Sequence, residues 1–363
     1  MLLDLLRLNP KKILVINTFG IGDVLFTTPF IVSLKKNFPA CFIGYLGNKR
    51  TSQFLAGHSN IDAIYEYERD EFKGLYDSSK IKFLSKLKSL LDSIKRERFE
   101  LVFDFSLNRN INFLTMFIGI PCRVGLNYKG RMPFSTVKIP FDGFEGKHVV
   151  EHYLDILVSM GVTSLERELN WNVSEADRQW ADEFLRQHGV SDKDRLIGVI
   201  PGAGESWGPQ ARFRRWDAAN YAKLVDKLIE NSPSKFILMG AKAEEELCAA
   251  LARPGCKHLI ESQGKTTIAQ LAALIKRCRL VVLNDGGPLH IAVAVKTRTV
   301  SVFGPVDEQV YGPYGPVSEH LVVKREMSCQ PCYRRFRMTD CQHVSCLRNL
   351  SVDEVYEKAL QLL

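Results

Sequence analysis

The sequence predicts an α/β protein built from two Rossmann-like domains that face each other across a cleft. Short apolar runs alternate with amphipathic segments in the first half of the chain, and the same alternation starts again after residues 161–195. The length of 363 residues suits two domains. We therefore expect an N-terminal domain over residues 1–170 and a C-terminal domain over residues 171–350. A C-terminal helix over residues 351–363 is expected to pack back on the N-terminal domain.

Within each half, the apolar and amphipathic stretches have the lengths typical of strands and helices. In the first half, the expected strands cover residues 12–17, 41–46, 63–67 and 101–105, and the expected helices cover 24–37 and 81–96. In the second half, the expected strands cover residues 196–200, 236–239, 280–283 and 299–303, and the expected helices cover 218–230, 244–251 and 288–295. Parallel strands joined by helices bind ligands beyond their carboxyl ends, so the loops there are the candidate sites.

Composition is that of an ordinary globular protein with a mild basic excess. Hydrophobic residues make up 45% and charged residues 25% of the chain. The net charge of +8 suits an anionic ligand or a membrane surface and is too dilute to indicate nucleic-acid binding. No apolar run reaches the roughly 18 residues of a membrane span, and the N-terminus is a poor signal peptide. Together with nine cysteines, these features predict a reducing, cytoplasmic environment.

The loop after the first expected strand contains Gly20-Ile21-Gly22-Asp23. Its glycines let a ligand approach the backbone closely, and Asp23 places a carboxylate where the next helix begins. A dinucleotide fingerprint would need a small residue at position 25, which is Leu25, so NAD binding is disfavoured. Asp23 is therefore either a functional acid or an ordinary capping or first-turn acid.

The second candidate loop, after residues 280–283, reads Asn284-Asp285-Gly286-Gly287-Pro288-Leu289-His290. Proline suits the first turn of a helix, and the glycines let a ligand close on the free N–H groups there. The positive end of the helix dipole suits a pyrophosphate. The alternative is an ordinary strand–turn–helix with a capping aspartate.

Several motifs occur in an order that resembles glycosyltransferase family 9. They are residues 12–29 (KILVINTFGIGDVLFTTP), Pro201-Gly202-Ala203, Arg214-Arg215-Trp216, residues 284–290 (NDGGPLH), Phe303-Gly304-Pro305 and Gly312-Pro313-Tyr314-Gly315. Members of this family are heptosyltransferases that transfer L-glycero-D-manno-heptose from ADP-heptose to the inner core of lipopolysaccharide. The resemblance covers about residues 12–350. It implies a GT-B fold, with the acceptor on the N-terminal domain and the nucleotide sugar on the C-terminal one.

The resemblance also implies roles for individual residues and a metal-independent, inverting transfer with no cofactor required for catalysis. Asp23 matches the general base, and a single base without a covalent nucleophile gives inversion. Gly22 and Arg109 are the acceptor-side candidates. The donor-site candidates are Gly202, Arg214, Arg215, Glu244, Asp285, Gly286, Gly287 and His290. Glu244 is expected to accept hydrogen bonds from ribose, and its alternative is a solvated first-turn acid.

The C-terminal cysteines form a separate candidate site. Cys329, Cys332, Cys341 and Cys346, with His343 between the last two, are soft ligands at spacings that could hold a structural zinc. Disulfides or reduced buried thiols are the alternatives. A second pair, His148 and His152, resembles a helical metal pair, but interdomain or core histidines are the better interpretation.

Residues 73–98 carry eight basic residues against three acids. A phosphorylated lipid acceptor at the inner face of the inner membrane would favour such a surface, although a solvated helix face explains it too. We expect a cytoplasmic enzyme, peripheral on that membrane, with ADP-heptose as donor, the lipopolysaccharide core as acceptor and no nucleic-acid partner. The alternatives are a related glycosyltransferase with another nucleotide sugar, a sugar-nucleotide epimerase of GT-B shape, and a non-catalytic nucleotide-sugar binding protein.

Overall fold

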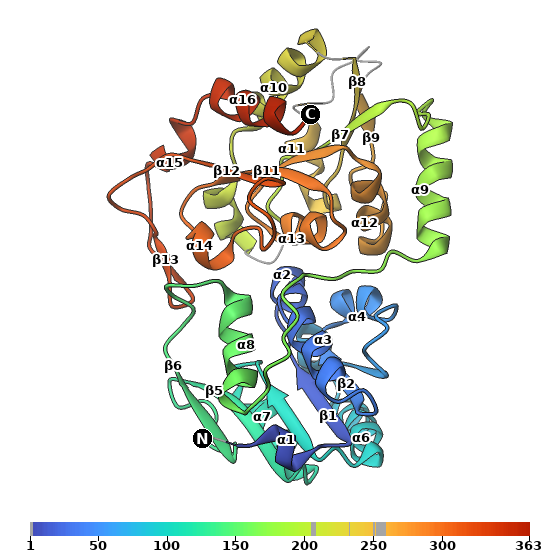
Figure 1. The fold of residues 1–363 in the computed structure, drawn as a ribbon, viewed down its shortest axis with the longest axis vertical. Coiled ribbons are helices and arrows are strands. Elements are labelled where there is room, and N and C mark those ends of the chain that lie inside the picture. Colours follow the sequence, from blue (N-terminus) through green and yellow to red (C-terminus); the bar gives the residue numbers. More distant parts are fainter. Residues whose placement is uncertain (1–2, 205–207, 232, 250, 252–258) are drawn as a thin grey trace. The chain divides into compact units, whose positions relative to one another are not determined.

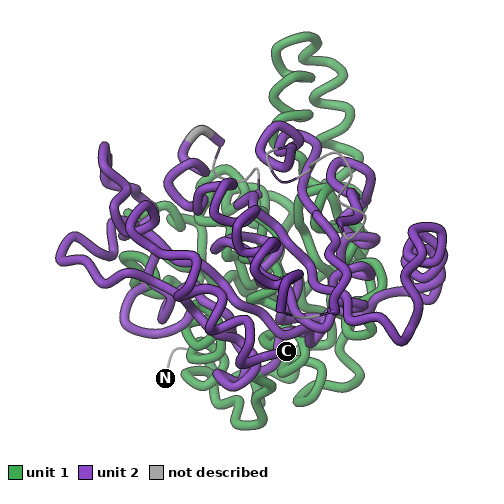
Figure 2. The backbone as a smooth tube through the Cα atoms, turned by 90° about the horizontal axis from the view of Figure 1, so that it is seen from above, with its two compact units in different colours: residues 1–144, 149–167 green, residues 145–148, 168–363 purple. Residues whose placement is uncertain are grey.

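The structure is a computed structural model, and it describes residues 3–204, 208–231, 233–249, 251 and 259–363. The chain folds into two compact units (Figure 2). Unit 1 comprises Met1–Phe144 and Val149–Arg167, and unit 2 comprises Glu145–His148 and Glu168–Leu363. Each unit contains a six-stranded sheet in which all neighbouring strands are parallel, so the predicted α/β class is confirmed.

Unit 1 alternates strands and helices along the chain (Figure 1). Its strands are β1 (Lys12–Ile16), β2 (Phe42–Gly47), β3 (Ala63–Glu66), β4 (Leu101–Asp104), β5 (Cys122–Tyr128) and β6 (Val137–Phe141). Its helices are α1 (Leu5–Leu8), α2 (Ile21–Leu25), α3 (Thr28–Asn37), α4 (Lys49–Leu55), α5 (Arg69–Ser78), α6 (Lys80–Glu97), α7 (Arg109–Phe117) and α8 (Val149–Ser159). The strand order β3-β2-β1-β4-β5-β6 is that of a doubly wound Rossmann sheet.

Helices cover both faces of the unit 1 sheet. On one face, Ile94 of α6 and Ile111 of α7 lie in a single apolar cluster with side chains of β1 and β4. On the other face, Phe30 of α3 packs edge-on against Phe103 of β4, with 4.8 Å between the ring centroids. Burial on two faces explains why these strands read as continuous apolar runs in the sequence.

One expected helix of unit 1 is divided in two. The sequence predicted a single helix over residues 24–37, but α2 ends at Leu25 and α3 begins at Thr28. Pro29 lies in the first turn of α3, where its missing N–H costs nothing. Thr27 bridges the break, because its hydroxyl donates to the carbonyl of Val24 at 2.6 Å. The break leaves Asp23 on a short helix of its own.

Unit 2 repeats the same arrangement. Its strands are β7 (Arg195–Ile200), β8 (Ser234–Leu238), β9 (Leu259–Glu261), β10 (Leu280–Asn284), β11 (Arg298–Phe303) and β12 (His320–Lys324), and a small hairpin holds β13 (Tyr333–Arg334) and β14 (Arg337–Met338). Its helices are α9 (Glu175–Gln187), η1 (Gly208–Arg214), α10 (Ala218–Asn231), η2 (Lys242–Glu244), α11 (Glu245–Ala249), α12 (Ile268–Arg277), α13 (Gly287–Ala294), α14 (Glu308–Tyr311), α15 (Ser345–Arg348) and α16 (Val352–Leu362). The sheet order β12-β11-β10-β7-β8-β9 is again the Rossmann order.

The C-terminal helix α16 belongs to the core of unit 2. Val355, Ala359 and Leu362 lie in one buried cluster with apolar residues of α10 and of strands β7 to β12. Helix α16 contacts α10 and β11 directly, and the two helices lie close together in Figure 1. Its packing partner therefore differs from the N-terminal domain expected from the sequence, because the sheet of unit 2 has an apolar face that α10 alone does not cover.

Candidate active site

Each sheet has a topological switch point, where the connections leave the sheet in opposite directions. It lies between β1 and β4 in unit 1 and between β7 and β10 in unit 2. Doubly wound sheets bind ligands outside the carboxyl ends of the strands at this point. Asp23 follows β1, Gly202 follows β7 and Asp285 follows β10. The predicted residues thus fall in two regions, one in each unit.

Asn284, the last residue of β10, ties three segments of unit 2 together. Its Nδ2 donates to the carbonyl of Pro201 at 2.7 Å, and its Oδ1 accepts from the N–H of Trp216 at 2.9 Å. The side chain is buried. Asn284 therefore joins the end of β10 to the loop after β7 and to the segment of paired arginines. The sequence motif contained this residue, but no role was predicted for it.

Two predicted glycines allow these loops to pack closely. A Cβ atom on Gly286 would lie 2.7 Å from the carbonyl oxygen of Ala203. A Cβ atom on Gly202 would collide with the carboxylate of Glu244. Both glycines therefore allow close approach of neighbouring groups of the protein, whereas the glycines of these loops were expected from the sequence to admit a ligand.

Arg214 and Asp285 form a buried ion pair. Arg214 Nε donates to Asp285 Oδ2 at 2.9 Å, and Arg214 Nη2 makes a second close contact with Oδ1. The two side chains are only 6% and 2% exposed. Burial raises the pKa of the Asp285 carboxyl, and the Arg214 guanidinium opposes that rise. The bidentate geometry fixes both side chains beside the start of α13.

The neighbouring arginine pairs with a different acid. Arg215 Nη2 lies 3.2 Å from Glu244 Oε1, which also accepts from the N–H groups of Ala203 and Gly204 at 3.1 Å. Glu244 Oε2 accepts from the N–H of Ala241 at 3.1 Å. Glu244 is 3% exposed, so the solvated first-turn alternative is wrong. Its carboxylate organises the loops after β7 and β8, and Arg215 remains 28% exposed.

Helix α13 begins at Gly287, directly after this cluster; Pro288 in its first turn has no N–H, and the N–H of Leu289 donates to the carbonyl of Gly286 at 3.1 Å. His290 lies on α13 and is 5% exposed. Its pKa is well below the usual value because of burial, with His148 and Arg214 lowering it further. His290 is therefore a neutral imidazole near neutral pH. The structure brings all eight predicted donor-side residues together around the switch point of unit 2.

Asp23 lies in the first turn of α2. The N-cap position is Gly20, and no side chain caps the helix, so Asp23 is not the N-cap. Asn17 holds the loop, since its Nδ2 donates to the Asp23 carbonyl at 3.1 Å and its Oδ1 accepts from the N–H of Phe19 at 3.1 Å. The Asp23 side chain is half-buried. Burial raises the pKa of Tyr45, and the charge of Asp23 adds to that rise.

A second carboxyl group of unit 1 was missed by the sequence analysis. Asp104 ends β4, across the switch point from the loop of Asp23, and is 1% exposed. Its Oδ1 accepts from the N–H and the hydroxyl of Ser106 at 3.0 and 2.6 Å. Burial raises the pKa of Asp104 to about 6. The available signal was a lone acid at the end of a strand whose other residues are apolar.

The two acceptor-side candidates also lie beyond carboxyl ends of unit 1 strands. Gly22 is in the first turn of α2, next to Asp23. Arg109 is the exposed first residue of α7, which follows β4. The Asn108 side chain caps this helix, accepting from the N–H of Asn110 at 2.9 Å.

The C-terminal cysteines lie around the β13–β14 hairpin and α15, away from the residues above along the chain. The described cysteines are free thiols, and no three His, Cys, Asp or Glu side chains of the described residues form a metal-binding group. Burial raises the pKa of Cys332 to about 11, and Cys329, Cys341 and Cys346 add to the rise. A structural zinc here stays a prediction.

His148 belongs to the predicted histidine pair and precedes α8. Its Nε2 atom lies 3.1 Å from the carbonyl oxygen of Gly312, which fits the interpretation as a core histidine.

The two doubly wound parallel sheets, each with polar residues at its switch point, match the GT-B fold. Comparison with known proteins specifies the family. The model of glycosyltransferase family 9 (heptosyltransferase) matches residues 87–343, so the chain belongs to this family. It is therefore a glycosyltransferase, as its motifs predicted.

Individual relatives agree with this assignment. Lipopolysaccharide heptosyltransferase 3 of Escherichia coli K12 is 27% identical over 298 residues, which cover 81% of this chain and 82% of the relative. The crystal structure of a family 9 glycosyltransferase from Veillonella parvula is 25% identical, with a TM-score of 0.82 and 97% coverage of both chains. The ADP-heptose lipopolysaccharide heptosyltransferase II of E. coli shares the fold, with a TM-score of 0.73, 20% identity and coverage of 97% and 98%. No helix of the described residues is long and apolar enough to cross a membrane.

Proposed function

We propose that the protein is an inverting heptosyltransferase that transfers heptose from ADP-heptose to the inner core of lipopolysaccharide. The observation that carries this proposal is the pair of adjacent arginines at the switch point of unit 2. Each is paired with a buried carboxylate, and both lie in the cluster at the start of α13. A transferase that releases a nucleoside diphosphate needs positive charge at this position.

The donor's diphosphate would bind at the start of α13. The positive end of the α13 helix dipole favours negative charge there. Arg215 is the better placed cation, because Arg214 is buried against Asp285. The Nε–H of Arg215 is buried without a hydrogen-bond partner among the described residues, so it is a donor that a phosphate oxygen could satisfy. Glu244 positions Arg215 and the loop after β7, which makes it a support for the donor and its ribose.

Asp23 would serve as the general base. The acceptor hydroxyl oxygen attacks the anomeric carbon from the face opposite the diphosphate. Its proton moves to the Asp23 carboxylate, and the bond from the anomeric carbon to the phosphate oxygen breaks, so that ADP leaves with the electron pair. Arg109, exposed at the start of α7, would bind an anionic group of the acceptor. The enzyme would work at the inner face of the inner membrane, where its lipid acceptor lies.

Catalysis through these residues needs no metal. The charge that grows on the leaving diphosphate would be balanced by Arg215 and by the positive end of the α13 helix dipole. Hard cations need several carboxylate oxygens, and the acids at the unit 2 site are already paired with arginines. We expect transfer to survive EDTA, and activity that is lost with EDTA and restored by Mg²⁺ or Mn²⁺ would contradict this.

The experiment is a thermal-shift screen with ADP-, UDP- and GDP-sugars, followed by measurement of nucleotide diphosphate released in the presence of acceptor. ADP and ADP-heptose should raise the melting temperature most, since saturation at 100 times Kd adds about 2.7 kcal/mol of stability. Release of ADP should require the lipopolysaccharide-core acceptor. Stabilisation by a UDP- or GDP-sugar alone would reassign the donor, and donor binding without any transfer would indicate a binding protein.

A further inference from the structure

Helices α5 and α6 of unit 1 form a hairpin whose corner exposes large apolar side chains. Tyr76 near the end of α5 is 52% exposed, and Ile81 and Leu84 in the first turns of α6 are 81% and 60% exposed. The core-facing side of the hairpin is filled by other residues, such as Phe72, which is 3% exposed and packs edge-on against Phe83. Tyr76 also packs edge-on against Phe83, with 5.4 Å between the ring centroids, whereas the side chains of Ile81 and Leu84 are mostly exposed.

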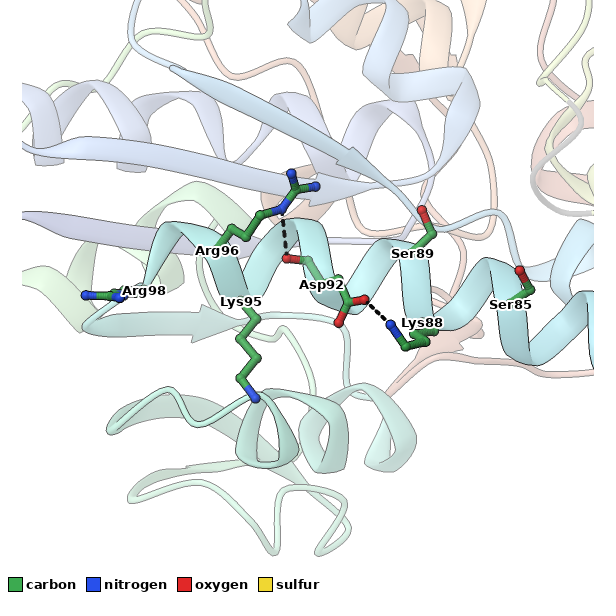
Figure 3. A pocket seen from close by; sticks show the side chains of 7 residues that line it. All are labelled: Ser85, Lys88, Ser89, Asp92, Lys95, Arg96 and Arg98. Atoms are coloured by element: carbon green, nitrogen blue, oxygen red, sulfur yellow. Dashed lines mark hydrogen bonds and ion pairs between the residues drawn. The ribbon is translucent and has the colours of Figure 1, made fainter.

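A basic trough continues along α6 from this corner (Figure 3). It is an open hollow of about 830 Å³ lined by Ser85, Lys88, Ser89, Asp92, Lys95, Arg96 and Arg98. Four of these side chains are cations and one is an acid. Lys88 pairs with Asp92 at 2.6 Å, whereas Lys95 and Arg98 form no ion pair with any described residue. Figure 3 shows their side chains extending away from the helix axis.

Exposed apolar side chains and unpaired cations on one helix match the surface of an anionic lipid bilayer. A bilayer takes apolar side chains at the headgroup boundary and attracts nearby cations through its anionic lipids. A soluble polyanion would use the cations alone and leave Ile81 and Leu84 in water. We infer that the corner of the α5–α6 hairpin and the trough on α6 dock the protein on an anionic lipid bilayer. The inference rests on the proposed function in one respect: the bilayer is the one that carries the lipid acceptor.

Vesicle cosedimentation of the full chain tests this inference. We expect binding to phosphatidylcholine vesicles with about 30% phosphatidylglycerol, and little binding to phosphatidylcholine alone. Replacing Lys95, Arg96 and Arg98 by Gln should weaken binding roughly fivefold per removed charge. The double variant Ile81→Ser/Leu84→Ser should weaken it roughly tenfold, because the apolar contact is lost.

Matched controls come from unit 2. Gln at Lys193, Lys223 and Lys276 removes three exposed charges, and Val317→Ser removes an apolar side chain that is 80% exposed. These controls should bind vesicles as the parent does. Equal effects of control and test variants would overturn the docking surface, as would equal binding to neutral and anionic vesicles. Unchanged binding of Ile81→Ser/Leu84→Ser would also overturn it, because adsorption would then be electrostatic only.

The docking surface and the proposed function can fail separately. All variants should keep the parent's melting temperature, its stabilisation by ADP and its rate with an acceptor dispersed in detergent. Vesicle binding as expected, without nucleotide release from any donor, would preserve the docking surface and reject the proposed function. Normal transfer in detergent without vesicle binding would preserve the proposed function and reject the docking surface.

Discussion

Arg214 and Arg215 are adjacent in the chain, yet their environments predict different consequences of substitution. Arg214→Gln leaves the buried Asp285 carboxylate without its cation, which typically costs about 3–5 kcal/mol of stability. Arg215→Gln removes a partly exposed cation from Glu244, whose carboxylate keeps three backbone N–H donors, so the melting temperature should fall much less. It should weaken ADP binding by about 1.5–3 kcal/mol, the range for a charge-assisted hydrogen bond. Chemical denaturation and calorimetry of both variants check this contrast. A loss of stability in Arg215→Gln as large as in Arg214→Gln, with normal ADP binding, would contradict it.

A second prediction for a single residue concerns Asp104: its burial should make the stability of the protein depend on pH. Its folded pKa of about 6 lies above its ordinary value of 3.8, so the folded state binds a proton more tightly than the unfolded chain. The contribution of Asp104 to the free energy of unfolding therefore falls as pH rises from about 4 to about 6, by up to about 3 kcal/mol. Asp104→Asn should remove this component, as measured by urea denaturation at pH 4.5 and 7. The exposed Asp142→Asn is the control, and identical pH profiles of Asp104→Asn and the parent would reject the shifted pKa.

At the scale of elements, α16 contributes to the core of unit 2. Deleting residues 351–363 removes Val355 and Leu362, which are 0% and 4% exposed, from the cluster. Burying each such side chain contributes about 1.5–3 kcal/mol, so the deletion should lower the melting temperature markedly and weaken ADP stabilisation. Leu360→Ser, at a position that is 45% exposed, should have little effect. A deletion variant with the parent's melting temperature would mean that α16 does not complete this core.

The central strands β1, β4, β7 and β10 could be predicted from the sequence, and so could the edge strand β3, whereas β5, β6, β9 and β12 were missed. Strands β1 and β10 read as apolar runs because helices cover both of their faces. The edge strand β6 has the exposed residues Lys138 and Pro140 and gives no such signal, and β9 has only three residues. The boundary at Thr27 was missed because the apolar pattern continues across it, and α16 was predicted as a helix but with the wrong packing partner.

At the scale of the whole molecule, the duplication of the Rossmann order places the candidate residues at two switch points. The motifs identified the glycines and acids of these loops, because the residues of each motif are neighbours in the sequence. The partners of Arg214 and Arg215 could not be predicted, since Asp285 and Glu244 lie 71 and 29 residues away in the chain. Only the folded loops show which arginine is buried and which stays available to a ligand. Asp104 was hidden for the same reason, because its burial follows from packing and not from a motif.

The most direct test of the proposed transfer is the turnover of Asp23→Asn, measured as ADP released from ADP-heptose in the presence of acceptor. Asn keeps the shape of the side chain but cannot accept the proton of the acceptor hydroxyl. We expect the rate to fall by about 10²–10⁴, with the donor Kd within a few-fold and the melting temperature unchanged. A near-parental rate in a folded Asp23→Asn would contradict the proposal, and Asp23 would then be only a first-turn acid of α2.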